Sequence, residues 1–354
     1  MKILAIFGRE KEYNRNAKIL KVLERGNNQI KVIASNKKGL IKKYFDVIFH
    51  FLLLKNKRDY DLIYIGFFGH PIILTLFPFF IGKFIVFDVF ISVYDTMVFD
   101  RTKVKKYSIL AFIFYLIDYF SCRLANIILL DTNEHIKYFS KTFKIKESKL
   151  QKVFVGSNED LFYKRKKTRK DKKFVIGFYG HFLPLQGVPK IVKVAKKLKD
   201  YNDIKFEIIG EGITFEESIN EAKGLNNIQF LGEKPYNQLP DYIKNWDLGL
   251  GIFGDTNKSL RVIPNKIFDY LYMEIPFLTK KSDAIQELFG NIEVITVEND
   301  IDKIVNKILY IKKNYNKIKP LFKKLKNETM IKLNKNLNEM LKNIYKTNTN
   351  KLKS

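Results

Sequence analysis

Positive charge, small residues and the start of a helix meet in one stretch of the chain, residues 248–279. A hydrophobic strand there ends in a loop around Gly254 that offers backbone amides, and Pro264 with Asn265 opens a helix. The cations of the stretch are Lys258, Arg261 and Lys266. A helix N-terminus favours a bound anion, and lysine or arginine neutralises the charge that develops on a leaving phosphate. The stretch therefore predicts a diphosphate site.

Asp269 lies one turn inside the same helix, on the side of Asn265 and Lys266. Its carboxylate could accept hydrogen bonds from the hydroxyls of a ribose or another sugar, and a surface carboxylate without chemistry is the alternative. No two carboxylates of the chain are obviously set up as an acid and a nucleophile. A site of this kind would work mainly through electrostatics.

The chain around this stretch alternates between strands and helices. Its 354 residues exceed what one hydrophobic core organises, and 46% of them are hydrophobic, so we expect two domains. Strands are predicted near residues 2–7, 29–34, 61–66, 83–89 and 126–130, and again near 174–180, 204–209, 228–231, 247–252 and 275–279. Apolar runs separated by amphipathic segments are typical of parallel sheets covered on both faces. The predicted fold class is α/β, with two doubly wound, Rossmann-like domains.

The limits of the domains follow from composition. Residues 164–173, KRKKTRKDKK, contain no apolar side chain and precede a strong strand, which predicts a solvated basic linker. This linker would separate an N-terminal domain, 1–163, from a C-terminal domain, 174–314. Residues 315–354 carry apolar positions at helical spacing among lysines, which predicts a basic amphipathic helical tail. Two such sheets facing a cleft bind ligands at the carboxyl ends of their strands.

Residues 251–266, GIFGDTNKSLRVIPNK, resemble the donor-site motif of family 4 glycosyltransferases of the GT-B fold. The resemblance is to a subgroup with the pattern G-I-F-G-D-T-x-K-x-x-R-V-I-P-N-K. Residues 178–188, FYGHFLPLQGV, and 208–212, IIGEG, resemble two more segments of that subgroup in the same order. In the first half, residues 87–101 and 153–162 do so as well. The resemblance covers roughly residues 1–310.

The resemblance implies an enzyme that moves a hexosyl or related group from a nucleotide-sugar donor to a glycan or lipid-linked acceptor. Transfer would proceed with retention and would need neither a metal nor a cofactor. The second domain would bind the donor and the first domain most of the acceptor. The implied donor-binding residues are Gly180, His181, Gln186, Gly210, Gly212, Gly254, Arg261, Pro264, Asn265 and Asp269.

The chain departs from the wider family at two places. That family carries two glutamates eight positions apart, where this chain has Arg261 and Asp269. It often has an arginine and a lysine in the first loop of the second domain, where this chain has His181 and Gln186. We therefore expect the phosphate role to be carried by Lys258, Arg261 and Lys266.

The first domain contributes a second group of candidates. Asp95, with Asp100 nearby, is the polar group expected to join Lys258 and Lys266 in catalysis, and a capping charge in a loop is an equal alternative. The acceptor-side candidates are Gly8, Arg9, Asn16, His70 and Arg101. His70 follows a predicted strand and could contact a hydroxyl of the acceptor or donor, or could simply begin a helix.

Asp59, Tyr60 and Asp61 form a D-x-D string, which holds a metal in a different glycosyltransferase fold. Here the string lies at the entry of a predicted strand, opposite the carboxyl end where ligands bind, and no other metal ligands cluster with it. No metal site is predicted.

The formal net charge of +27 would attract nucleic acid, anionic lipid or phosphorylated substrates alike. Residues 40–57 combine apolar side chains with lysines, which suits a helix lying on an anionic membrane surface, although its apolar face could equally cover the sheet. No apolar run reaches the roughly 20 residues of a spanning helix. The single cysteine, Cys122, and the absence of a secretory leader pattern at the start favour the cytoplasm, with possible peripheral contact on the cytoplasmic membrane face.

Two other functions remain open. Another GT-B enzyme, such as a nucleotide-sugar epimerase, would share the fold, since fold does not fix the reaction. A basic nucleic-acid-binding protein would share the charge, but no known nucleic-acid-binding module is recognisable in the sequence. No nucleic-acid partner is therefore expected.

Overall fold

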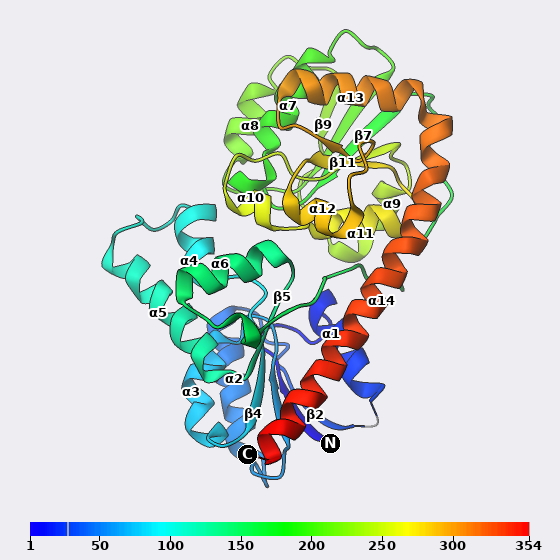
Figure 1. Ribbon diagram of the computed structural model, residues 1–354. Helices are drawn as coiled ribbons and strands as arrows, with labels where there is room; N and C mark the ends of the chain where they lie inside the picture. The colour runs from blue at the N-terminus through cyan, green and yellow to red at the C-terminus, as the bar shows by residue number, and fades with distance from the viewer. Residues whose placement is uncertain (27, 354) are drawn as a thin grey trace. The chain divides into compact units, whose positions relative to one another are not determined.

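The computed structural model describes residues 1–26 and 28–353 and contains two compact units (Figure 1). Unit 1 comprises residues 1–98, 102–155 and the chain from 333 onward, and unit 2 comprises residues 99–101 and 156–332. Each unit is built around a six-stranded parallel sheet. The predicted class, α/β with two Rossmann-like sheets, is confirmed.

Unit 1 has the strand order β2-β1-β3-β4-β5-β6. Its elements are β1 (Lys2–Ile6), α1 (Asn14–Glu24), β2 (Gln29–Ile33), α2 (Leu40–Leu53), β3 (Leu62–Ile65), α3 (His70–Phe80), β4 (Phe84–Asp88), α4 (Val93–Asp95), α5 (Ile109–Leu124), β5 (Ile127–Leu130), α6 (Asn133–Phe143), a short 3-10 turn (Glu147–Lys149) and β6 (Leu150–Lys152). A π-helical turn, Thr96–Asp100, follows α4 and continues into the segment counted with unit 2.

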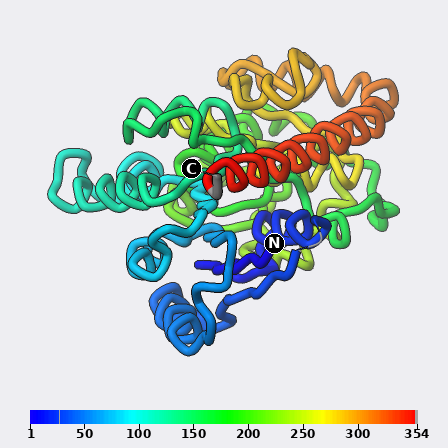
Figure 2. Tube along the Cα trace, turned by 60° about the horizontal axis from the view of Figure 1, so that its bottom comes forward, coloured from blue at the N-terminus to red at the C-terminus, as the bar shows by residue number. Residues whose placement is uncertain are grey.

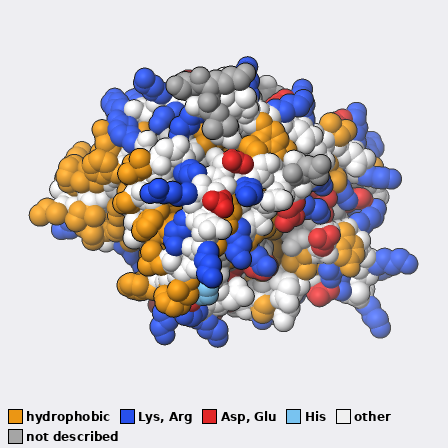
Figure 3. Space-filling model, turned by 90° about the horizontal axis from the view of Figure 1, so that it is seen from below, with side chains coloured by type: hydrophobic (Ala, Val, Ile, Leu, Met, Phe, Trp, Pro, Cys, Tyr) orange, Lys and Arg blue, Asp and Glu red, His pale blue; other side chains and the backbone are white. Residues whose placement is uncertain are grey.

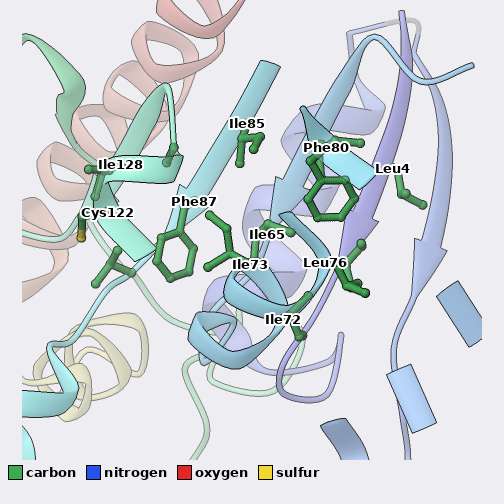
Figure 4. Close-up of a cluster of buried hydrophobic side chains, with 14 of the residues drawn as sticks. Leu4, Ile65, Ile72, Ile73, Leu76, Phe80, Ile85, Phe87, Cys122 and Ile128 are labelled. Atoms are coloured by element: carbon green, nitrogen blue, oxygen red, sulfur yellow. The ribbon is translucent and has the colours of Figure 1, made fainter. Parts of the chain in front are cut away.

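The two faces of the first sheet have separate cores. Side chains of α2, α3, α5 and α6 pack on one face, where Phe80, Phe87 and Cys122 are among the buried groups (Figure 4). Side chains of α1 and of the C-terminal turns of the last helix pack on the other face. Strands buried on both faces explain the continuous apolar runs of the sequence.

Unit 2 has the strand order β12-β11-β10-β7-β8-β9. Its elements are β7 (Phe174–Tyr179), a 3-10 turn (Pro184–Gln186), α7 (Val188–Lys197), β8 (Ile204–Ile209), α8 (Phe215–Glu221), β9 (Ile228–Phe230), a 3-10 turn (Tyr236–Gln238), α9 (Leu239–Ile243), β10 (Leu248–Leu250), α10 (Lys258–Arg261), α11 (Asn265–Tyr272), β11 (Phe277–Lys280), α12 (Asp283–Phe289), β12 (Thr296–Val297) and α13 (Ile301–Lys313).

Glycines in the central strands of unit 2 make room for large aromatic rings. A Cβ on Gly177 would lie 1.8 Å from Trp246 Cδ2, and one on Gly249 would lie 2.5 Å from Tyr270 Cδ2. The two rings are themselves in edge contact, with centroids 5.9 Å apart. Because Tyr270 belongs to α11, this packing seats α11 directly on β7 and β10.

The predicted helical tail is the single long helix α14, Tyr315–Lys353. It is not a separate body, since its first part is counted with unit 2 and the chain from residue 333 with unit 1. Figure 2 shows the C-terminal part of α14 running beside α1, and Leu337, Met340 and Ile344 are buried in the core that the two helices share. The apolar spacing read from the sequence is therefore a packing face.

The boundary between the units lies at residues 155 and 156, not at the basic segment 164–173. That segment follows the surface of unit 2 because Asp247 and Asn245 hold it there. Asp247 pairs with Lys167 and Arg169, and Asn245 Oδ1 accepts a hydrogen bond from Thr168 N at 2.8 Å. Its lysines and arginines are thus partly neutralised in place.

Two strands escaped prediction, β6 and β12, at the edges of the two sheets. Each has only two or three residues, and polar side chains interrupt both. In the described part of the chain, no helix is long and apolar enough to cross a membrane.

Candidate active site

Helix α11 brings two ionisable side chains into the interior of unit 2. It begins after Pro264, at Asn265, without a hydrogen bond from a capping side chain, and its residues from Lys266 to Tyr272 are buried. The amides of an uncapped first turn are donors for an anion. Lys266 lies in that turn and Asp269 follows one turn later.

Lys266 is held in an amide and aromatic surrounding. Its Nζ donates a hydrogen bond to Gln186 Oε1 at 2.6 Å and lies 3.6 Å from the centroid of the Phe178 ring. A Cβ on Gly180 would come within 3.0 Å of the same Nζ. Only 4% of Lys266 is exposed, and burial lowers the pKa of its amine well below the ordinary value. The first loop of the second domain thus contacts Lys266 through Gly180 and Gln186.

Asp269 accepts hydrogen bonds from three hydroxyl groups of the protein. Ser157 Oγ donates to Oδ1, Tyr179 Oη donates to Oδ2, and Tyr236 Oη lies 3.4 Å from Oδ2. The residue is 1% exposed. Burial first, and then the nearby Asp269 carboxylate, raises the pKa of Tyr179 well above its ordinary value, so Tyr179 remains a donor. Asp269 is therefore not a surface carboxylate but the acceptor at the centre of a buried hydroxyl cluster.

The loops after β7, β8 and β10 approach one another backbone to backbone. Gly210 has φ +126°, and a Cβ there would lie 2.0 Å from Gly180 O. A Cβ on Gly254 would lie 2.2 Å from Pro184 O. Gly212 belongs to the same set, since its φ is +149° and it abuts Phe182. Glycine is required at these positions because the backbones meet.

Lys280 fixes the loop between β10 and α10. From the carboxyl end of β11 its Nζ donates to Gly254 O at 2.7 Å and to Ser259 Oγ at 2.5 Å. Ser259 Oγ is in turn 2.9 Å from Gly254 O. The lysine is 4% exposed, and burial lowers its pKa. It ties the small-residue loop to the sheet.

Lys258 and Arg261 lie on the short helix α10. Lys258 is buried, and its Nζ donates to Asp100 Oδ2 at 3.1 Å within unit 2. Arg261 is half-buried. Asp100 thus compensates the charge of Lys258, as an anionic ligand would do.

A cavity of about 320 Å³ opens beside the two buried ionisable groups of α11. Its lining is Tyr179, Gly180, His181, Ile209, Gly210, Glu233, Lys234, Tyr236 and Leu239. Gly180 also adjoins Lys266, and both tyrosines also contact Asp269. His181 is largely exposed, and its Nδ1 lies 3.6 Å from Glu233 Oε1. The lining of the cavity combines apolar side chains, such as Ile209 and Leu239, with the polar side chains of Glu233 and Lys234.

Of the candidates in unit 1, Gly8 and Arg9 lie in the loop after β1, and Asn16 lies in the first turn of α1. Asn16 is fully buried, and its side chain accepts from Phe67 N and donates to Glu10 O. Gly8 abuts the backbone of Phe68, and Arg9 lies over the Tyr13 ring. Asn16 and Gly8 therefore position the first loop. Arg101 is exposed and is grouped with unit 2.

His70 and Asp95 both belong to a buried cluster around Asp118. His70 is 2% exposed, with Nε2 3.1 Å from Asp118 Oδ1. Asp118 also accepts from Ser92 Oγ at 2.6 Å and from the first amides of α4, and Ser92 Oγ accepts from Asp95 N at 2.9 Å. His70 thus begins α3, which is the second of the two roles considered for it from the sequence.

The D-x-D string contributes to strand geometry. Asp61 Oδ2 accepts a hydrogen bond from Lys2 N at 2.8 Å, which ties the starts of β1 and β3 together. Among the described residues there is no cluster of three or more histidine, cysteine or carboxylate side chains that could hold a metal ion.

Four participants were missed by sequence reasoning: Ser157, Tyr179, Tyr236 and Lys280. Lys280 and Tyr179 end apolar strands, so a search of strand ends would have found them. Ser157 and Tyr236 lie 112 and 33 residues away from Asp269 in sequence, and no local pattern connects them with α11.

The family model for glycosyl transferases group 1 matches residues 159–336. No curated protein matches the sequence.

Solved structures share the fold at low sequence identity. Sucrose-phosphate synthase from Thermosynechococcus elongatus is 12% identical, with a TM-score of 0.73, over 97% of this chain and 98% of that one. The catalytic domain of starch synthase IV from Arabidopsis thaliana, bound to ADP and acarbose, is 10% identical, with a TM-score of 0.70, over 99% of both chains. HepE from Anabaena, in complex with UDP and glucose, is 12% identical, with a TM-score of 0.66, over 97% and 99%. These likenesses show the GT-B fold.

Replacement of Lys266 by methionine is expected to stabilise the protein at neutral pH. In the wild type the folded amine has a pKa below its ordinary value of 10.5, so the unfolded state binds a proton that the folded state does not. Between the two pKa values, stability of the wild type rises with pH, and the advantage of Lys266→Met shrinks as pH approaches about 10. Urea unfolding across this range measures the difference, and a difference independent of pH would contradict the assignment.

Asp269→Ala is expected to lower the free energy of unfolding by about 3 kcal/mol, because it leaves buried hydroxyl donors without an acceptor. Tyr179→Phe removes only one donor and serves as the matched control, with a smaller loss. Chemical denaturation of both variants measures this. An unchanged stability of Asp269→Ala would show that the hydroxyl cluster does not support the fold.

Proposed function

The chain belongs to the glycosyl transferases of group 1, and we propose that unit 2 binds a nucleotide-sugar donor from which a hexosyl or related group is transferred. The acceptor is a glycan or a lipid-linked sugar. The observation that carries this proposal is the buried Lys266 amine in the uncapped first turn of α11, beside Gly180 and Gln186.

The donor diphosphate lies against the first turn of α11. Its negative charge is met by helix amides and by Lys266, whose amine has a pKa that burial lowers and that a bound anion raises again. Lys258 and Arg261 supply further positive charge from α10, after Lys258 exchanges Asp100 for phosphate. These cations, rather than a metal, neutralise the leaving diphosphate, and the donor already carries the transferred group, so no cofactor takes part.

The nucleoside of the donor occupies the cavity next to Gly180. Ile209 and Leu239 supply apolar contacts, and Glu233 with Lys234 supplies polar ones at the edge. Two neighbours in the fold support a donor of this class, since HepE was solved with UDP and glucose and starch synthase IV with ADP and acarbose. Glu233 and Lys234 select the base of the donor, because the preferred nucleobase is the one whose polar groups can pair with these two side chains.

The sugar lies between the diphosphate and Asp269. Because that carboxylate already accepts from Ser157 and Tyr179, its role is to hold the Tyr179 and Tyr236 hydroxyls in fixed orientation beside the donor. His181 and Gln186 complete the donor side. Gly210, Gly212, Gly254, Pro264 and Asn265 act through backbone shape.

The acceptor is bound by loops of unit 1 around Gly8, Arg9 and Asn16, with Arg101 supplying positive charge. His70 and Asp95 act through position, since both are buried in the Asp118 cluster that orders the loop after β4. The transferred sugar retains its anomeric configuration, as the family resemblance implies, and the leaving diphosphate assists the attack from the same face. The reaction takes place in the cytoplasm.

A thermal-shift screen against UDP, GDP, ADP and CMP, each with EDTA and with Mg²⁺, tests this proposal. One nucleotide is expected to raise the melting temperature without metal, since a ligand at about 100 times its Kd adds roughly 2.7 kcal/mol. The shift should disappear in Lys266→Met and persist in Lys193→Met, which removes an exposed lysine of α7 in the same unit.

Two results would contradict the proposal. If no nucleotide raises the melting temperature, unit 2 does not bind a nucleotide-sugar donor. Conversion of a nucleotide sugar to its epimer in the absence of any acceptor, seen by product analysis, would make the chain an epimerase.

A further inference from the structure

Helix α2 is apolar on two opposite faces. Val47 and Phe51 are buried in the core beneath the sheet. Ile41, Phe45 and Phe49 lie on the other side, and they are exposed by 72%, 71% and 58%. At 100° per residue these three positions form one stripe along the helix. Both interpretations of residues 40–57 therefore apply: one face of α2 covers the sheet, and the other is an exposed apolar face of the kind that suits a membrane surface.

The neighbouring helices carry exposed apolar side chains as well. Helix α2 packs against α3, and α3 packs against α5, on the same side of the first sheet. Ile81, the residue after α3, is 70% exposed, and Ile109 and Phe112 in the first turn of α5 are exposed by 82% and 60%. We name Ile41, Phe45, Phe49, Ile81, Ile109 and Phe112 the α2–α5 surface.

The segments that carry the α2–α5 surface are rich in lysine. Between Lys37 and Arg58 the sequence has seven lysines and arginines and one carboxylate, Asp46, which pairs with Lys37. Of these cations Lys43 is buried and pairs with Glu10. Between residues 102 and 113 it has three lysines and no carboxylate. Figure 3 shows hydrophobic side chains gathered along one side of this face of the molecule, with lysines and arginines among them.

We propose that the α2–α5 surface docks unit 1 on an anionic lipid bilayer. Large exposed apolar side chains enter the boundary between headgroups and acyl chains, and the lysines beside them pair with lipid phosphates. The positive charge of the segments that carry this surface favours an anionic bilayer over a second copy of the chain as its partner. A symmetric contact would bring the same lysines of both copies together, whereas an anionic surface complements them.

This docking does not use the donor site, because every residue of the α2–α5 surface belongs to unit 1, whereas α11 belongs to unit 2. It would hold the chain at a membrane without a spanning helix. A lipid-linked acceptor would then meet the protein at the surface where it is made available.

Co-sedimentation of the full chain with vesicles tests the proposal. Phosphatidylcholine vesicles containing phosphatidylglycerol are expected to bind the protein, pure phosphatidylcholine vesicles much less, and added salt should weaken binding by screening. The double variants Phe45→Ser/Phe49→Ser and Ile109→Ser/Phe112→Ser should each lose roughly tenfold or more in affinity.

The matched control is Leu321→Ser/Ile331→Ser, which removes two exposed apolar side chains of α14 in unit 2. It should bind vesicles like the wild type. Circular dichroism and nucleotide-induced thermal shifts confirm that all variants are folded, so a failure of docking is distinguished from a failure of the donor site. Equal binding by all variants would overturn the proposal. So would self-association in sedimentation velocity that the α2 and α5 variants abolish, with no vesicle binding.

Discussion

The burial of Lys266 in the first turn of α11 is the interaction on which the rest of the site depends. An amine in this position costs free energy in the absence of a ligand, because it leaves water for an aromatic and amide surrounding. That cost is offset by packing elsewhere on the same helix. Tyr270 fills the space that Gly249 leaves open and contacts Trp246, which occupies the space beside Gly177. The sheet fixes the position of α11, and α11 fixes the position of the Lys266 amine.

Asp269, one turn further along α11, strengthens the same arrangement. Its three hydroxyl donors come from the start of unit 2, from the end of β7 and from the turn before α9. One carboxylate thus connects three segments around the cavity. The Lys280 amine likewise connects the end of β11 with the loop around Gly254. Unit 2 therefore places its polar groups before a ligand arrives, which is the property that electrostatic catalysis needs.

Much of this fold could be predicted from the sequence, because parallel strands that are buried on both faces consist of continuous runs of apolar residues. The strands that escaped, such as Leu150–Lys152 and Thr296–Val297, are too short for a periodic signal. The segment 164–173 misled for a different reason. Its composition indicates a solvated linker, but the acidic partner that anchors it, Asp247, lies almost 80 residues later.

In the candidate site, too, local features could be predicted from the sequence and contacts between distant segments could not. The local motif of residues 251–266 located the helix start and its cations, whereas the partners of Asp269 come from distant segments that no spacing connects. Helix α2 shows a third limit. Its apolar residues occupy both a packing face and a solvent face, and hydrophobicity alone does not distinguish the two.

The most direct test of the central claim is calorimetric titration of the wild type and Lys266→Met with the preferred nucleoside diphosphate and with its nucleoside. If Lys266 meets the diphosphate, the variant should bind the diphosphate about ten- to a hundredfold more weakly, as expected for a lost charge-assisted hydrogen bond. Its affinity for the nucleoside should be unchanged, because the nucleoside cavity is intact. Equal losses for both ligands, or no loss for either, would show that Lys266 supports only the fold.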